Sequence, residues 1–219
     1  MDEQSNSDHL SSSLTDLMTS LMVIFILLLL VFISHTASKD AALRDVLLTE
    51  LKKDLIPQGF NESSIRPDPK DRNAILVIVP NNLMRFESRE SYLPVDGQAF
   101  LRSHIPLLAK VLCSAEFSSS VDSIVVEGHT DREPWQGSTS EESENKNLKL
   151  SQDRSMAVVE EALSDLSGKP TRPCFLEKLS ATGRGEQDPE NTDEESRRVI
   201  FKIHVKAKDE VTIEQQVKK

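Results

Sequence analysis

The sequence predicts a mixed α/β domain that follows a single membrane-spanning helix. Every residue from Leu21 to Ile33 is apolar, which is typical of a membrane segment. From Ala74 onward, strand-like apolar runs alternate with segments of helical spacing, in the order βαβαβ with one more strand at the end. This order predicts a sheet with helices on one face. We therefore expect a tail at 1–13 and a membrane helix at 14–34. An amphipathic helix with a linker follows at 35–73, then an α/β domain at 74–207 and a second tail at 208–219.

Composition narrows the possible functions. The formal net charge is −10, and a chain without a basic patch is a poor partner for nucleic acid. Cys113 and Cys174 do not have the spacing of a metal site. The two cysteines are either buried free thiols or, in an oxidising compartment, joined in one disulfide. His129 has no second ligand at metal spacing, so we expect no metal. The sequence has no nucleophile-elbow or P-loop motif, so we expect no cofactor and no enzymatic activity.

The apolar run is shorter than the roughly 20 residues that cross a bilayer. It reaches that length if the helix begins near Leu14 and ends near Ser34, which brings Asp16 into the membrane. A cleaved signal peptide is disfavoured because the first 13 residues contain no lysine or arginine. A plain anchor with Asp16 at the interface remains an alternative.

Asp16, Thr19 and Ser20 form the candidate ion-conducting group. Their i, i+3, i+4 spacing places them on one face of a helix. A carboxylate inside a membrane helix costs about 2.5–3.5 kcal/mol on insertion scales, so such a residue is a functional candidate by default. If Asp16 takes up and releases protons opposite a protein partner, it acts as a proton relay.

The stretch from Thr15 to Phe25 resembles the transmembrane signature of MotB-type stator subunits. In that family an aspartate followed by a Met-Thr-small-Met run carries the ion-conducting carboxylate. The resemblance implies the same role for Asp16 and a MotA-like membrane partner.

The connector between the membrane helix and the α/β domain is predicted to form an amphipathic helix over 41–56. Four leucines recur at i+4 spacing, and Pro57 and Gly59 end the pattern. The leucine stripe, formed by Leu43, Leu47, Leu51 and Leu55, is typical of packing, here in a helix pair outside the membrane. In MotB-like proteins the same region can instead act as a plug that blocks ion flow. The polar segment 61–73 predicts a loop.

The α/β domain is predicted from short apolar runs and helical spacing. We expect strands at 74–79, 83–86, 123–127, 176–182 and 199–205, the last as an edge or pairing strand, and helices at 97–113 and 150–166.

Four motifs in this domain resemble those of OmpA-like domains. They are the strand-to-loop segment Val125–Asp131, the Asn147 to Arg154 segment with Leu150 and Ser151, the Ala181–Pro189 loop, and Arg197-Arg198-Val199. That family binds the peptide stem of peptidoglycan through diaminopimelate. The resemblance implies a peptidoglycan site made of Thr130, Asp131, Asn147, Leu150, Ser151, Arg154 and Arg198.

A zwitterionic ligand needs a fixed cation and a fixed anion. Arg154, expected at the start of a helix, can clamp a carboxylate, and Asp131 can hold an ammonium group. The helix N-terminus expected near Ser151 would favour anions. The alternative is a direct Asp131–Arg154 salt bridge without a ligand. The segment 132–146 is longer than is usual in the family and is expected as a loop that lengthens the rim, covers the pocket or contacts another partner.

Together the resemblances imply the B subunit of an ion-driven rotary motor in a bacterial inner membrane. Two such chains would form a dimer inside a ring of five MotA-like subunits, with the N-terminus cytoplasmic and the domain periplasmic. The positive-inside rule favours the opposite orientation, but peptidoglycan binding requires this one. The Asp16-Leu17-Met18-Thr19 and Met22-Val23-x-Phe25 pattern also resembles the B component of Zorya-type anti-phage defence motors, and the short acidic tail and the linker length favour that assignment. A flagellar stator and a passive membrane-to-wall anchor are the alternatives.

Overall fold

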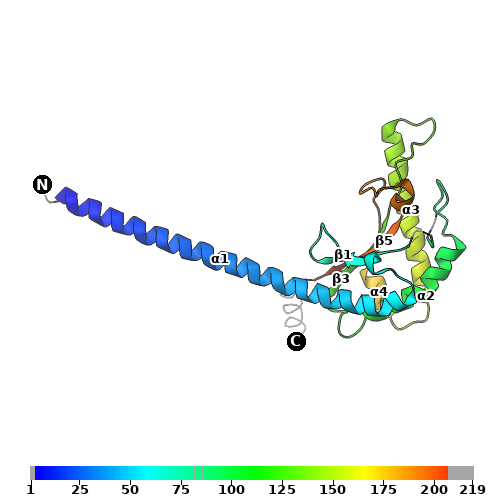
Figure 1. Ribbon diagram of the computed structural model, residues 1–219, viewed down its shortest axis with the longest axis horizontal. Coiled ribbons are helices and arrows are strands. Elements are labelled where there is room, and N and C mark those ends of the chain that lie inside the picture. The colour runs from blue at the N-terminus through cyan, green and yellow to red at the C-terminus, as the bar shows by residue number, and fades with distance from the viewer. Residues whose placement is uncertain (1–2, 81, 85, 207–219) are drawn as a thin grey trace. The chain divides into compact units, whose positions relative to one another are not determined.

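The computed structural model (Figure 1) describes residues 3–80, 82–84 and 86–206, with side chains for 15–33 and from 43 onward. Contacts divide the chain into two units, Met1–Ala41 and Ala42–Lys219. Helix α1 (Glu3–Leu55) includes both predicted N-terminal helices. Within it, Thr15–Ile33 is long and apolar enough to cross a membrane, and none of this segment is buried. Helix α1 gives way to a 3-10 turn at Pro57, and Gly59 closes that turn with a φ of 104°, which suits glycine.

The second unit contains a five-stranded sheet in the order β1-β2-β5-β3-β4. Its strands are β1 (Ile65–Pro67), β2 (Ala74–Ile78), β3 (Val121–Gly128), β4 (Leu179–Gly183) and β5 (Val199–Val205). Only the β3–β4 pair is parallel among these strands. Strand β5 pairs with β2 and with β3, so its role as an edge strand is wrong and its role as a pairing strand is confirmed.

Four helices accompany this sheet: α2 (Val95–Leu112), α3 (Ser140–Asp165), α4 (Arg172–Lys178) and the short α5 (Asp193–Ser196). The apolar side chains of α2, α3 and α4 join those of the sheet in one core. Within β5, the side chains that face this core alternate with Lys202 and His204, which are partly exposed on the opposite face. The prediction of a sheet with helices on one face is confirmed.

The leucine stripe of the connector belongs to this same core. Leu47, Leu51 and Leu55 are at most 1% exposed, and Leu43 packs partly buried against the cluster. The stripe therefore packs on its own domain, and the expectation of a helix pair outside the membrane is wrong for these leucines. The segment predicted as a loop also contributes, because β1 lies inside it and pairs with β2.

Three predicted elements differ from the structure. Leu83 and Met84 lie in a turn, not a strand, because their amides donate to the carbonyl of Pro80 at 3.0 and 3.2 Å. Strand β4 begins at Leu179, three residues later than expected, because α4 occupies the chain up to Lys178.

The third difference concerns α3, which begins ten residues earlier than expected. Thr139 and Glu142 form a capping box there: each side chain accepts a hydrogen bond from the other residue's backbone amide. Part of the predicted loop 132–146 is therefore helical.

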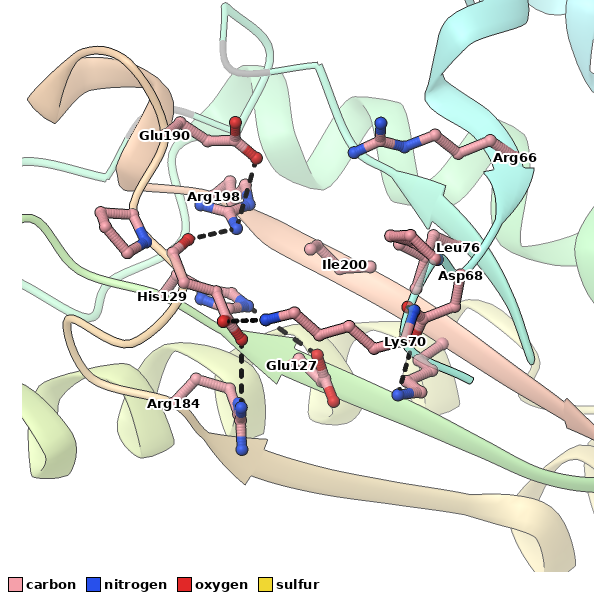
Figure 2. A pocket seen from close by; sticks show the side chains of 14 residues that line it. Arg66, Asp68, Lys70, Leu76, Glu127, His129, Arg184, Glu190, Arg198 and Ile200 are labelled. Carbon is pink, nitrogen blue, oxygen red and sulfur yellow. Dashed lines mark hydrogen bonds and ion pairs between the residues drawn. The ribbon is translucent and has the colours of Figure 1, made fainter. Parts of the chain in front are cut away.

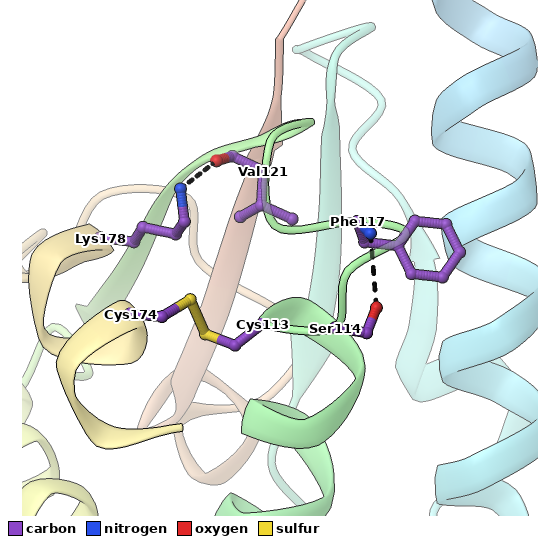
Figure 3. The surroundings of a disulfide bond; sticks show 6 residues. All are labelled: Cys113, Ser114, Phe117, Val121, Cys174 and Lys178. Atoms are coloured by element: carbon purple, nitrogen blue, oxygen red, sulfur yellow. Dashed lines mark hydrogen bonds between the residues drawn. A yellow bond between two sulfur atoms is a disulfide. The ribbon is translucent and has the colours of Figure 1, made fainter. Parts of the chain in front are cut away.

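A disulfide between Cys113 and Cys174 joins the end of α2 to α4 (Figure 3). The two cysteines are 61 positions apart in the sequence, so the bond closes a long loop that includes β3 and α3. Beside it, Lys178 Nζ donates to the carbonyl oxygen of Val121 at 2.7 Å and connects α4 to the start of β3. Of the two states left open by the sequence, the structure has the oxidised one.

Candidate functional site

A small pocket lies beyond the end of β3, beside α3. Its empty volume, including its open mouth, is about 270 Å³. Five predicted site residues line it, namely Thr130, Asp131, Asn147, Leu150 and Arg154. Sequence reasoning did not include the other lining residues in the site, which are Ser88, Arg89, Glu133, Trp135 and Arg197.

Arg154 is the buried cation of the pocket and is only 2% exposed. Its Nε donates to the carbonyl oxygen of Glu90 and its Nη2 to that of Glu87, both at 2.9 Å. The guanidinium also lies 5.0 Å from the ring centroid of Phe86. Burial lowers the pKa of Arg154 to about 10, and the nearby Asp131 carboxylate opposes part of this change. The side chain therefore stays charged at neutral pH in a fixed orientation, as recognition of a carboxylate requires.

Asp131 is the buried anion, and its partner is Arg197. Oδ2 of Asp131 accepts a hydrogen bond from Nη1 of Arg197 at 2.5 Å. Oδ1 accepts the backbone amide of Glu133 at 3.2 Å. The alternative of a direct Asp131–Arg154 salt bridge is wrong for the described residues, because Arg154 donates to backbone carbonyls instead.

Arg198, predicted for this site, lies elsewhere. Consecutive side chains in extended chain point to opposite sides, so Arg197 shares the side of Val199 and Arg198 the side of Ile200. Arg198 consequently lines a different groove, together with Ile200 and Lys202. The Arg197-Arg198 pair therefore contributes its first member to this pocket and its second to the other groove.

Two polar atoms in the pocket are buried without a hydrogen-bond partner among the described residues. They are Oγ1 of Thr130 and Nδ2 of Asn147. A buried donor or acceptor without a partner costs about 1–3 kcal/mol, so such atoms are uncommon unless a ligand or water completes them. Both atoms belong to residues that line the space between Asp131 and α3.

Trp135 covers the pocket from the inserted segment. Its Nε1 donates to Oδ1 of Asn147 at 2.7 Å, and its backbone amide donates to Oγ of Ser143 at 3.0 Å. The cations of Arg89 and Lys146 lie 5.3 and 5.6 Å from the indole centroid. Of the three roles open for the inserted segment, covering the pocket agrees with these contacts.

Ser151 has a structural position. Its hydroxyl donates to the carbonyl of Leu148 at 2.7 Å and accepts the amide of Gly185 at 2.8 Å, which ties α3 to the loop after β4. Helix α3 approaches β3 so closely that a Cβ on Gly128 would lie 2.2 Å from the Ser151 carbonyl oxygen. Ser151 and Arg154 lie well inside α3, so the helix N-terminus expected near them is wrong.

The candidate ion-conducting residues lie in the apolar part of α1. Thr19 directs its hydroxyl to its own helix, within 3.0 Å of the backbone carbonyls of Thr15 and Asp16. Asp16 is exposed in the isolated chain, as are all residues of Thr15–Ile33. Elsewhere, the described residues contain no group of three histidine, cysteine or acidic side chains placed to hold a metal.

No family model matches the sequence, and no curated protein is similar to it by sequence. Solved structures are similar in fold. A MotB-like protein from Desulfovibrio vulgaris has a TM-score of 0.50 at 21% identity, covering 79% of this chain and 98% of its own. The periplasmic domain of Helicobacter pylori MotB (residues 97–256) has a TM-score of 0.48 at 16% identity, covering 68% and 94%. An OmpA-like domain from Francisella tularensis has a TM-score of 0.41 at 21% identity, covering 62% and 78%. The structural neighbours are thus MotB-like and OmpA-like periplasmic domains.

Proposed function

We propose that this chain is the peptidoglycan-anchored B subunit of an ion-driven motor of the MotA/MotB type. One observation carries the anchoring part of the proposal. The pocket beside α3 combines a buried guanidinium, a buried carboxylate and two buried polar atoms without partners, in Arg154, Asp131, Thr130 and Asn147.

This set suits a zwitterionic amino-acid group such as the diaminopimelate of a peptidoglycan stem. A ligand carboxylate would lie against Arg154, whose Nη1 has no hydrogen-bond partner among the described residues. A ligand ammonium would lie against Asp131, where Oδ1 has only one backbone donor. Thr130 and Asn147 would complete their hydrogen bonds on the same ligand.

The disulfide and the apolar helix support the location of this anchor. A disulfide persists in an oxidising compartment such as the periplasm. The Thr15–Ile33 segment fits a single pass through the inner membrane, with the domain outside and the N-terminus in the cytoplasm.

Binding to cell wall is tested by sedimentation of the full chain, in detergent micelles, with purified peptidoglycan sacculi. Asp131→Asn removes the anionic charge at almost constant shape and should weaken binding at least tenfold, because a charge-assisted contact contributes about 1.5–3 kcal/mol. Asp153→Asn is the matched control, since Asp153 lies on α3 in an exposed pair with Lys149. Equal binding by wild type and Asp131→Asn would reject this pocket as the anchor site.

The motor part of the proposal depends on Asp16. A buried acid in a membrane helix is costly, and this cost is explained if a MotA-like subunit surrounds it and the carboxylate carries an ion. We propose a dimer of this chain within five MotA-like subunits, with Asp16, Thr19 and Ser20 at the ion path. A Zorya-type defence motor is the favoured assignment, and a flagellar stator is the second.

Ion transport is tested by proton flux into vesicles that contain this chain and a MotA-like protein from the same genome. Wild type should conduct and Asp16→Asn should not. Ser13→Ala, a polar change just before the apolar segment, serves as the control. If Asp16→Asn conducts like wild type, Asp16 is not the ion carrier. If neither protein conducts while sacculus binding is intact, a passive membrane-to-wall anchor replaces the motor.

A further inference from the structure

A second site lies on the face of the sheet that is opposite the helices. A polar groove there has an empty volume of about 1070 Å³, including its open mouth. Leu76 of β2 and Ile200 of β5 form its floor, and charged side chains from β1, β3 and the loop before α5 form its walls (Figure 2). The groove shares no lining residue with the pocket beside α3.

Most charges in the groove neutralise each other. Lys202 Nζ lies 2.7 Å from a carboxylate oxygen of Asp68. Lys70 and Arg184 both pair with Asp188. Among the charged lining residues these contacts leave two arginines, Arg66 and Arg198, and two acids, Glu127 and Glu190.

Arg198 is 7% exposed, yet only one of its nitrogens is hydrogen-bonded. Nη2 donates to the carbonyl oxygen of Asp188 at 2.8 Å. The same nitrogen lies 3.4 Å from Oε1 of Glu190, which is long for a charge-assisted hydrogen bond. Nε and Nη1 are buried and have no hydrogen-bond partner among the described residues. Burial also lowers the pKa of Arg198.

Arg66 faces the same space from β1. Figure 2 shows its side chain extending across the groove above Ile200, toward the side where Glu190 and Arg198 lie. It has no ion pair within the part of the chain that the structure describes. Its positive charge is close enough to lower the pKa of Arg198, and two like charges that face one space repel unless an anion lies between them. Glu190, Asp188 and Glu127 act on the pKa of Arg198 in the opposite direction, and of these carboxylates only Glu190 forms an ion pair with Arg198, at 3.4 Å.

We propose that Arg66 and Arg198 together bind an oxyanion, a carboxylate or phosphate group, on the open face of the sheet. Nη1 of Arg198, which has no hydrogen-bond partner among the described residues, and Nη2, which Glu190 contacts only at 3.4 Å, lie side by side at the end of the guanidinium. Such an adjacent pair of donors is the geometry that guanidinium groups use to bind such anions. The ligand oxygen replaces the long contact of Glu190, and Arg66 closes over the ligand from the opposite wall. This site is separate from the proposed peptidoglycan pocket and does not depend on it.

The test uses the full chain in detergent micelles, with arginine labelled by ¹⁵N at Nε. Inorganic phosphate and N-acetyl-D-alanine are titrated separately at constant ionic strength. The Nε–H resonance of Arg198, identified by its absence in Arg198→Lys, should move saturably with a dissociation constant of about 1–10 mM for at least one probe. The tighter probe identifies the phosphate or the carboxylate source.

Variants then locate the binding. The Arg66 side chain is exposed, so Arg66→Gln should leave the fold intact. It should weaken binding about tenfold, the factor that corresponds to losing one charged contact. Arg102→Gln removes an equal charge from α2, where the side chain is 72% exposed, and should bind like wild type. Asp131→Asn should also bind like wild type, so failure of the peptidoglycan pocket is distinguishable. Absence of a saturable shift, or equal affinity of Arg66→Gln and wild type, overturns the proposal.

Discussion

The indole of Trp135 donates a hydrogen bond to Asn147 at 2.7 Å and so occupies the side-chain oxygen of a proposed ligand-binding residue. The amide nitrogen of the same side chain is buried without a partner among the described residues. The pocket is therefore in a covered state, in which a ligand must displace the indole before it can reach all of Asn147. This relationship makes Trp135 a reporter of binding.

We predict that diaminopimelate shifts the emission of Trp135 to longer wavelength. Trp135 is the single tryptophan in the sequence, so its fluorescence has one source. Displacement from Asn147 exposes the ring to water, and the shift should saturate with ligand concentration. Asp131→Asn should abolish the shift at the same concentrations. Calorimetric binding without any change in emission would show that the ligand enters while Trp135 stays in place.

Ser151→Ala should destabilise the domain without changing ligand affinity. The Ser151 hydroxyl accepts the buried amide of Gly185, and its loss leaves that amide without a partner, at a cost of about 1–3 kcal/mol. Urea denaturation should give a lower midpoint with an unchanged slope. Ser140→Ala, at the exposed start of α3, is the matched control. A Ser151→Ala chain of normal stability but weak sacculus binding would restore Ser151 to the ligand site.

Reduction of the Cys113–Cys174 disulfide should lower the free energy of unfolding by about 2–4 kcal/mol, because the bond constrains the unfolded chain. Urea denaturation with and without dithiothreitol measures the difference. The double variant Cys113→Ser/Cys174→Ser should match the reduced protein and show no response to dithiothreitol. A midpoint unaffected by reductant in wild type would contradict the prediction.

Acid should destabilise the domain through Asp188. Hydrogen bonds from Lys70 and Arg184 lower the pKa of Asp188 from 3.8 to about 2. Because the folded pKa is the lower one, the ionised carboxylate stabilises the fold above the ordinary value, and this contribution is lost as pH falls from 3.8 toward 2. Asp188→Asn should reduce the acid dependence of the urea midpoint in that window. Asp122→Asn, an exposed carboxylate on β3, should keep the wild-type dependence.

The sequence predicted most strands and both long helices of the domain because their apolar spacing reflects burial directly. It missed β1, since a three-residue strand containing Pro67 has the composition of a loop. It placed the start of α3 too late because the first turns of that helix are rich in serine and glutamate. The capping box at Thr139 and Glu142 was the available signal.

The candidate site was predicted in part, for a similar reason. Motif residues identified Asp131, Asn147 and Arg154, but which residue pairs with which depends on tertiary geometry. Only the strand phase separates Arg197 from Arg198, and a one-residue difference moves a side chain to the other face of the sheet. The hydrogen bond between Trp135 and Asn147 joins an inserted loop to a helix, and no local pattern predicts it.

The position of β5 has a consequence for biogenesis. Val199–Val205 is the last strand of the described residues, yet it lies between β2 and β3. The two halves of the sheet cannot join until this final segment is available, so the pairing is non-local and late. An incompletely synthesised chain therefore holds two separate sheet fragments with unpaired edges. The second unit becomes one continuous sheet only when Val199–Val205 has paired on both sides.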